Sequence, residues 1–140
     1  MRISKRTRAR ISCFVSLYLY DVGKIPPKEI LSTFINNQQN IGVLAQPQIR
    51  KFYEELFLTT VKNIDEIDRI IQTATEKPIY PVDKAIIRMA TAEMLYMKNE
   101  VAVVINEAIE ISKMYSPNEE KGPDFINGVL DTIAKSYQLK

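Results

Sequence analysis

Apolar residues recur at helical spacing in nearly every segment of this 140-residue chain, and this pattern constrains the fold more than any other feature. In the first segment, four apolar residues fall at i, i+3, i+4 and i+7: Ile11, Phe14, Val15 and Tyr18. This spacing places them on one face of a helix. No stretch alternates apolar and polar residues convincingly, as a half-buried strand does. The chain is therefore predicted to be all-α.

Prolines and glycines divide the pattern into about seven predicted helices. The first covers roughly residues 4–22, and the segment 23–27 ends it. Apolar stripes place the others around residues 30–35, 49–61, 64–74, 82–98, 101–115 and 125–137, with a polar loop over residues 36–48. The helix at 82–98 is apolar on more than one face, which predicts a central position. Residues 1–140 are expected to form a single domain, one compact helical bundle.

Composition excludes several kinds of active site. The chain has no histidine and one cysteine, Cys13, which rules out a Ser-His triad and a histidine- or thiolate-bound zinc. Its four glycines form no glycine-rich phosphate loop. We therefore expect no enzymatic activity, no metal and no cofactor. No apolar run approaches the roughly 20 residues of a membrane span, and a lone cysteine fits a reducing compartment, so a cytoplasmic location is expected.

Positive charge is concentrated in a basic N-terminal arm, residues 1–10. The arm contains Arg2, Lys5, Arg6, Arg8 and Arg10, and no acidic residue precedes Asp21. The whole chain has 19 basic and 17 acidic residues. Without the five basic residues of the arm, 14 basic residues remain against 17 acidic ones, so the rest of the chain is mildly acidic. An arginine-rich cluster favours phosphate contacts and base stacking, which predicts RNA binding. The alternatives are a solvated helix end, or a protein-interaction module whose arm binds an acidic partner or a membrane surface.

A second candidate RNA contact lies where the helix at 101–115 gives way to the next helix. Tyr115 and Phe125 flank a polar loop, and Lys113 and Lys121 lie beside them. Aromatic rings and cations at exposed helix ends suit single-stranded RNA, whose bases can stack on the rings. The alternative is that both rings belong to the core.

A structural ion pair is expected between two of the helices. Glu107 is one residue away from an apolar stripe, so it is expected to be partly buried, and a buried carboxylate needs a partner. Arg88, on the preceding helix, is the expected partner.

Four blocks of residues resemble the NusB family of transcription antitermination factors, in the order in which the family has them. The blocks are Arg8-Ala9-Arg10 with Leu17-Tyr18, Val82 to Arg88 with Glu93 and Leu95, Val104 to Lys113, and Phe125 to Asp131. Between Gly23 and Lys77 only the helical pattern matches. The blocks nevertheless span nearly the whole chain.

This resemblance implies an all-helical fold in two small halves and a role in transcription. Members bind the boxA element of ribosomal RNA leaders together with NusE, a small-subunit ribosomal protein, and so keep RNA polymerase elongating. The resemblance places Lys5, Arg6, Arg8 and Arg10 on phosphates, with Tyr18 near the same surface. It also matches Tyr115, Phe125 and Asn127 to RNA-contacting positions. Ribosomal-RNA cytosine methyltransferases begin with a similar module, but this chain has neither their glycine motif nor a second cysteine.

The chain departs from the family pattern beside the proposed RNA site. Ser116 replaces the usual glycine after the aromatic residue, and Gly122-Pro123-Asp124 replaces the common Ser-x-Lys before Phe125. The second change is expected to remove a hydroxyl and a cation, which puts RNA contacts from this loop in question.

Overall fold

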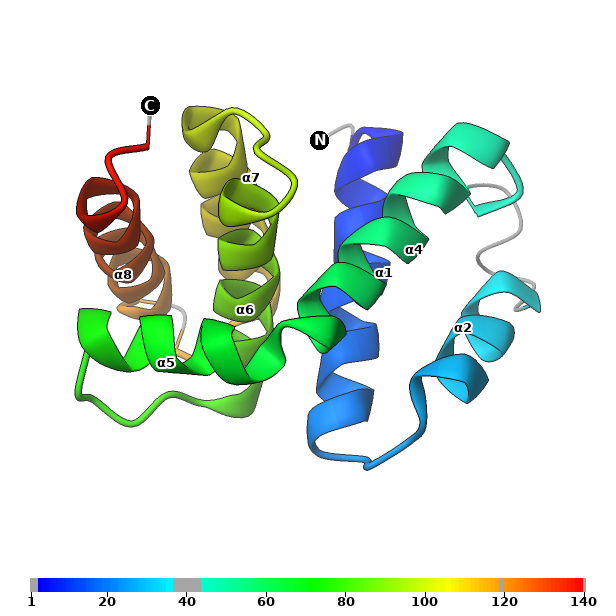
Figure 1. The fold of residues 1–140 in the computed structure, drawn as a ribbon, viewed down its shortest axis with the longest axis horizontal. Coiled ribbons are helices and arrows are strands. Elements are labelled where there is room, and N and C mark those ends of the chain that lie inside the picture. The colour runs from blue at the N-terminus through cyan, green and yellow to red at the C-terminus, as the bar shows by residue number, and fades with distance from the viewer. Residues whose placement is uncertain (1–2, 37–43, 119, 140) are drawn as a thin grey trace.

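The protein folds into helices packed in two groups (Figure 1). The computed structural model describes residues 3–36, 44–118 and 120–139. The described residues contain seven helices and no strand: α1 (Lys5–Asp21), α2 (Pro27–Asn36), α4 (Pro47–Lys62), α5 (Ile64–Ala74), α6 (Pro81–Leu95), α7 (Val101–Tyr115) and α8 (Gly122–Ser136). The predicted all-α class is confirmed. Arg2 and most of the expected loop at 36–48 lie outside the described residues.

Local sequence signals fix several helix starts. The Ser4 side chain caps α1 by accepting a hydrogen bond from the Thr7 backbone N–H at 3.1 Å. Helices α4, α6 and α8 each have a proline in the first two positions, where the missing N–H costs nothing. Helix α8 therefore begins at Gly122, three residues before the predicted start at Phe125.

Helix α6 lies at the centre of the molecule, as its apolar pattern predicted. It packs against α1, α4, α5, α7 and α8, and every residue from Ala85 to Met94 is buried. Helices α1, α2 and α4 form one group, and α5 to α8 form the other, with α1 and α4 contacting the second group mainly through α6 (Figure 1). The two groups of helices are the two halves that the resemblance implied.

One apolar core runs through both halves. Helix α1 contributes Cys13, Phe14 and Leu17 to the same buried cluster as Ile86 of α6. Burial of Cys13 is complete and raises the pKa of its thiol well above the ordinary value, so this cysteine is a core residue. Among the described helices, none has the length and apolar character needed to cross a membrane.

Candidate nucleic-acid interface

The basic residues at the start of α1 point in different directions. Successive helix positions turn by about 100°, so Arg6 and Arg8 project to nearly opposite sides. The Arg6 guanidinium lies 4.5 Å from the centre of the Phe52 ring on α4, a cation–π contact. Lys5 and Arg8 are exposed. The predicted arm is therefore the first turns of a folded helix, and Lys5 and Arg8 share its solvent face.

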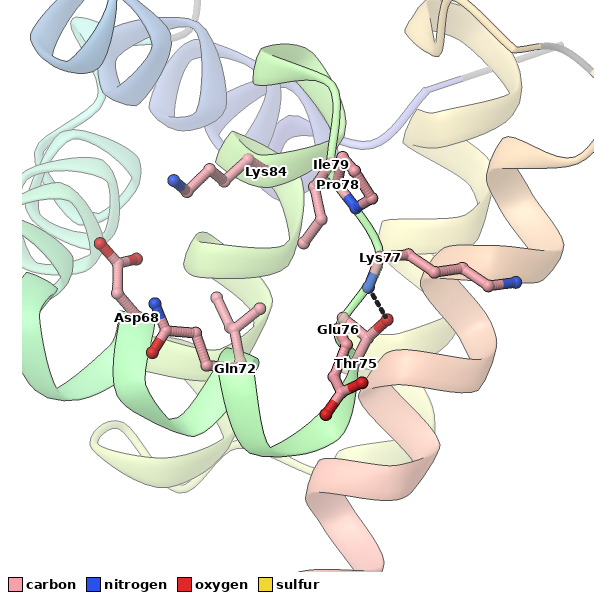
Figure 2. A pocket seen from close by; sticks show the side chains of 9 residues that line it. Asp68, Gln72, Thr75, Glu76, Lys77, Pro78, Ile79 and Lys84 are labelled. Atoms are coloured by element: carbon pink, nitrogen blue, oxygen red, sulfur yellow. Dashed lines mark hydrogen bonds between the residues drawn. The ribbon is translucent and has the colours of Figure 1, made fainter.

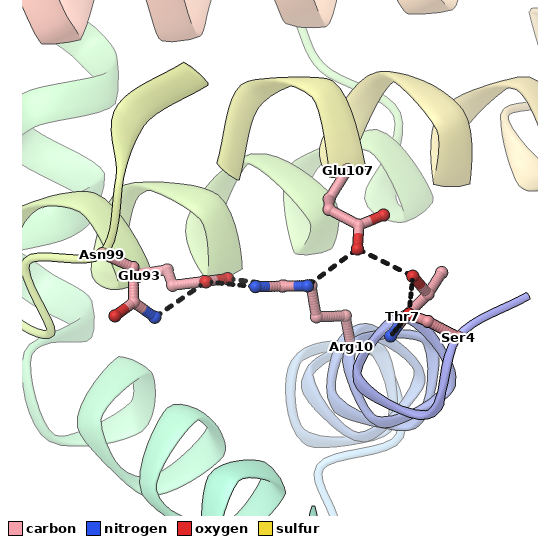
Figure 3. Close-up of polar contacts among 6 residues, drawn as sticks. All are labelled: Ser4, Thr7, Arg10, Glu93, Asn99 and Glu107. Carbon is pink, nitrogen blue, oxygen red and sulfur yellow. Dashed lines mark hydrogen bonds and ion pairs between the residues drawn. The ribbon is translucent and has the colours of Figure 1, made fainter. Parts of the chain in front are cut away.

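Arg10 lies in a buried polar network between α1, α6 and α7 (Figure 3). Its Nε and Nη2 donate to the two carboxylate oxygens of Glu93 at 2.8 and 2.6 Å, and its Nη1 donates to Glu107 Oε1 at 2.8 Å. Thr7 Oγ1 donates to the same Glu107 oxygen at 2.7 Å, and Asn99 Nδ2 donates to Glu93 at 2.9 Å. The expectation that Arg10 belongs to an exposed basic arm is wrong.

Charge pairing explains why Arg10 can be buried. Its side chain is 6% exposed and that of Glu93 is 1% exposed. Burial by itself lowers the pKa of the Arg10 guanidinium, but Glu93 and Glu107 outweigh burial and raise this pKa above its ordinary value. Arg10 therefore stays charged and links the two halves.

The expected pair between Arg88 and Glu107 is also wrong. Arg88 donates from Nε and Nη2 to Asp68 on α5, at 2.8 and 2.7 Å, and its Nη1 lies 3.4 Å from Asp21 Oδ2. Glu107 pairs with Arg10 instead. Positions 88 and 93 differ by about 140° around α6, so Arg88 faces away from the Arg10 network.

The sequence contains a feature that could have identified Asp68 as the partner of Arg88. Asp68 lies in the apolar row of Ile64, Ile67 and Ile71, where a charged side chain points toward the core. Such a residue needs a buried partner.

One of the predicted aromatic residues, Tyr115, contacts α1, the helix that has the basic first turns. The Tyr115 ring, 46% exposed at the end of α7, lies 5.3 Å from the Phe14 ring on α1, measured between centroids. Phe14 follows Arg8 by only about 9 Å along the helix axis. Phe125 and Tyr18 are half-buried. The structure thus brings Tyr115 beside the helix that carries Lys5 and Arg8.

The remaining predicted RNA contacts are exposed. They are Lys113 and Lys121, which are cations, and Asn127, which lies on α8. The Lys113 Nζ lies 3.2 Å from Glu110 Oε1 one turn earlier, which is a solvated pair of little energetic weight.

Hydrogen bonds fix the short connection between α7 and α8. Ser116 Oγ accepts from the Asn118 N–H at 3.2 Å, and Asn118 Oδ1 accepts from the Lys121 N–H at 3.2 Å. The Asn118 carbonyl accepts from the Gly122 N–H at 2.7 Å. Ser116 and Asn118 are therefore structural residues of the site, a role that was not predicted from the sequence.

A cavity of about 200 Å³ opens beside this connection. Its lining includes Tyr80, Asp83, Lys121 and Phe125. Asp83 is 3% exposed, and its Oδ1 has no hydrogen-bond partner among the described residues. Burial raises the pKa of Asp83, and a hydrogen bond from the Ser116 hydroxyl partly offsets this rise.

Another cavity, of about 360 Å³, lies between α5 and the start of α6 (Figure 2). Carboxylates and amines both line it: Asp68 and Glu76, and Lys77 and Lys84. Figure 2 shows the Lys77 side chain pointing away from the other lining groups. Because the cavity is lined by both carboxylates and amines, it has no preference for a polyanion. Within the described residues, no group of three or more Cys, Asp or Glu could hold a metal ion.

Comparison with known proteins identifies relatives along nearly the whole chain. The family model for the NusB family matches residues 7–135. The transcription antitermination protein NusB of Mannheimia succiniciproducens is 35% identical, over 99% of this chain and 95% of the relative. Its counterpart in Sulfurovum sp. is 34% identical, over 95% of this chain and 100% of the relative.

Solved structures also match nearly the whole chain. A chain in the crystal structure of antitermination factors NusB and NusE in complex with double-stranded RNA matches with a TM-score of 0.86 and 27% identity, over 97% of this chain and 100% of that one. NusB of T. maritima matches with a TM-score of 0.80 and 29% identity, over 96% of this chain and 93% of that one.

Proposed function

Because the chain belongs to the NusB family, we propose that it is an RNA-binding transcription antitermination factor. In this role it binds boxA-type leader RNA together with the ribosomal protein NusE. Through that complex it acts on elongating RNA polymerase and supports processive transcription of ribosomal RNA. The similarity to a NusB chain solved with NusE and RNA supports both partners.

The observation that carries the RNA-binding part is the position of Tyr115. Its ring is exposed and lies against Phe14, on the helix whose first turns expose Lys5 and Arg8. An exposed ring can stack on an unpaired base while nearby cations contact the phosphates on either side. Lys5 and Arg8 are assigned to phosphates, and Tyr115 and Phe125 to bases.

The other residues of the interface have supporting roles. Tyr18, Lys113, Lys121 and Asn127 border the surface and extend it along the RNA. Arg6 is exposed and its guanidinium lies over the Phe52 ring, so it is assigned a phosphate contact at the border of the surface. Arg10 holds α1 in place and does not contact phosphate.

Selective binding is assigned to the complex with NusE. Phosphate contacts carry no sequence information, and two rings with one amide read few bases. The chain alone should therefore bind RNA weakly and with little selectivity. We assign the protein no catalytic role and place it in the cytoplasm as one helical domain, residues 1–140.

A gel-shift series tests this function. Single-stranded boxA-like RNA, scrambled RNA and a duplex of the same sequence are each titrated, with and without NusE. We expect the tightest binding for boxA-like RNA in the presence of NusE. Anionic lipid vesicles and an acidic protein are the comparison ligands. Salt-dependent binding to either of these but not to RNA would favour a protein-interaction module with a basic surface.

A further inference from the structure

Ser116 joins the end of α7 to the start of α8, between the two proposed stacking rings. It directly follows Tyr115, and it is 6% exposed. Its Oγ accepts the Asn118 N–H, and the Asn118 carbonyl accepts the Gly122 N–H that opens α8. The Ser116 hydroxyl therefore belongs to the turn that sets where α8 begins. Phe125 follows Gly122 within the first turn of that helix, so the same turn sets its position.

Gly122 leaves the space that this hydroxyl fills. A Cβ on Gly122 would lie 2.1 Å from Ser116 Oγ and 2.9 Å from Ser116 Cβ. Atoms without a bond between them do not approach so closely, so a side chain at position 122 would displace the Ser116 side chain, including its Cβ. Gly128, six residues later on α8, has nothing within 4 Å of a Cβ. The crowding is therefore specific to position 122.

Both positions face the same carboxylate. The Ser116 hydroxyl is close enough to Asp83 to lower the pKa of that carboxyl group, and it also donates to the Asn118 carbonyl oxygen at 3.4 Å. Asp83 Oδ2 lies 3.8 Å from the place of a Gly122 Cβ, so a hydroxyl attached there could also reach it. Only one of the two positions has room for a side chain, and either could supply the hydroxyl.

We propose that Ser116 and Gly122 form a coupled pair, in which the Ser116 hydroxyl takes the place of a side chain at position 122 and holds Tyr115 and Phe125 in their RNA-binding geometry. Ser116 is then a positioning residue. This inference rests on the proposed RNA-binding function.

A double-mutant cycle tests the coupling. The proteins are the parent, G122S, S116G and the double variant S116G/G122S, and G128S is the matched control. Binding of single-stranded boxA-like RNA is measured over a salt series at a temperature where circular dichroism shows each protein folded. We expect G122S to bind about tenfold more weakly, because a displaced ring loses part of its stacking on a base. S116G should also weaken binding, whereas the double variant should return to within about threefold of the parent.

The salt dependence separates positioning from a general structural defect. Misplaced rings lower the affinity at every salt concentration but leave the phosphate contacts in place. The slope of log affinity against log salt concentration should therefore change by less than about 0.7, which is the contribution of one phosphate contact. G128S should match the parent in affinity and slope.

Three results would overturn the inference. They are parental RNA affinity in G122S, a double variant as weak as the two single effects combined, and melting temperatures that fall while the folded proteins keep parental affinity. If G122S does not fold, S116G and the double variant decide between rescue and additivity. If the parent binds no RNA, the proposed function fails, and the melting temperatures of the same four proteins still report whether the pair is coupled.

Discussion

Neighbouring charged residues at the start of α1 have different physical roles. Arg8 is exposed, and exposed charges contribute little to folding because water already solvates them. Arg10 is buried against Glu93, whose side chain is 1% exposed and has no access to water. A buried charge is tolerated only with its partner. The same residue type two positions apart thus lies in solvent in one place and stabilises the fold in the other.

Truncating Arg10 and Arg8 should separate these roles. Arg10→Ala leaves Glu93 buried and unpaired, so the free energy of unfolding should fall by about 3–5 kcal/mol. Arg8→Ala should change it by less than about 0.5 kcal/mol, while the log–log salt slope for single-stranded RNA falls by about 0.7. Urea unfolding and RNA titration measure the two effects. Equal stability of the two variants would show that the Arg10 network is solvated.

Asp83 gives a prediction about pH. Burial raises its pKa in the folded protein above the ordinary 3.8, so the folded state binds the Asp83 proton more tightly than the unfolded state does. The stability that this proton contributes is present below the unfolded pKa and is lost as pH rises through the folded pKa. Asp83→Asn carries no titrating group there. Relative to the parent, this variant should therefore gain stability as pH rises from about 4 to 7. Urea unfolding of both proteins across this range provides the test, and parallel curves would contradict the prediction.

At the scale of helices, periodicity predicted which elements form but not how each one begins. The stripe of Ile11, Phe14 and Tyr18 correctly identified α1. The start of α8 was misplaced because Gly122 and Pro123 are residues that usually break helices. In fact proline suits the first turn, where its missing N–H has no intrahelical partner.

The connection between α7 and α8 positions two rings with different burial. Tyr115 is 46% exposed, whereas Phe125 is half-buried against the core. Tyr115→Ala should therefore weaken RNA binding by about 1–3 kcal/mol and reduce stability by less than that. Phe125→Ala should reduce both the RNA affinity and the stability. Fluorescence titration with RNA and thermal melting of each variant measure the two quantities. Unchanged RNA affinity in Tyr115→Ala would remove this ring from the interface.

At the scale of the whole molecule, the residues that join the two halves lie far apart in the sequence. Arg10 and Glu93 are 83 positions apart. Arg88 reaches Asp21 of the other half, and within its own half it meets Asp68 instead of the predicted Glu107. Periodicity reveals which face of a helix is buried, but not which other helix covers it. For this reason the fold class could be predicted from the sequence, while both ion-pair assignments at α6 required the three-dimensional arrangement. At Tyr115 the exposure of the ring was predicted correctly, whereas its contact with RNA, which the resemblance supplied and composition alone left open, stays a prediction.

The whole molecule should bind RNA and NusE with positive coupling. A few exposed cations and two rings offer limited affinity alone, because phosphate contacts position RNA without reading it. A partner that contributes a second RNA-contacting surface should tighten binding by a coupling free energy of about 1–3 kcal/mol, or about 5- to 150-fold. Thermodynamic linkage requires RNA to tighten NusE binding by the same factor.

Calorimetric titration of each ligand, with and without saturating amounts of the other, measures both sides of this cycle. Arg8→Ala should lower the affinity for RNA while leaving NusE binding in the absence of RNA unchanged. Equal RNA affinity with and without NusE would mean that the two ligands bind independently, and sequence selectivity would then have to arise from the α1 and α7–α8 surface alone.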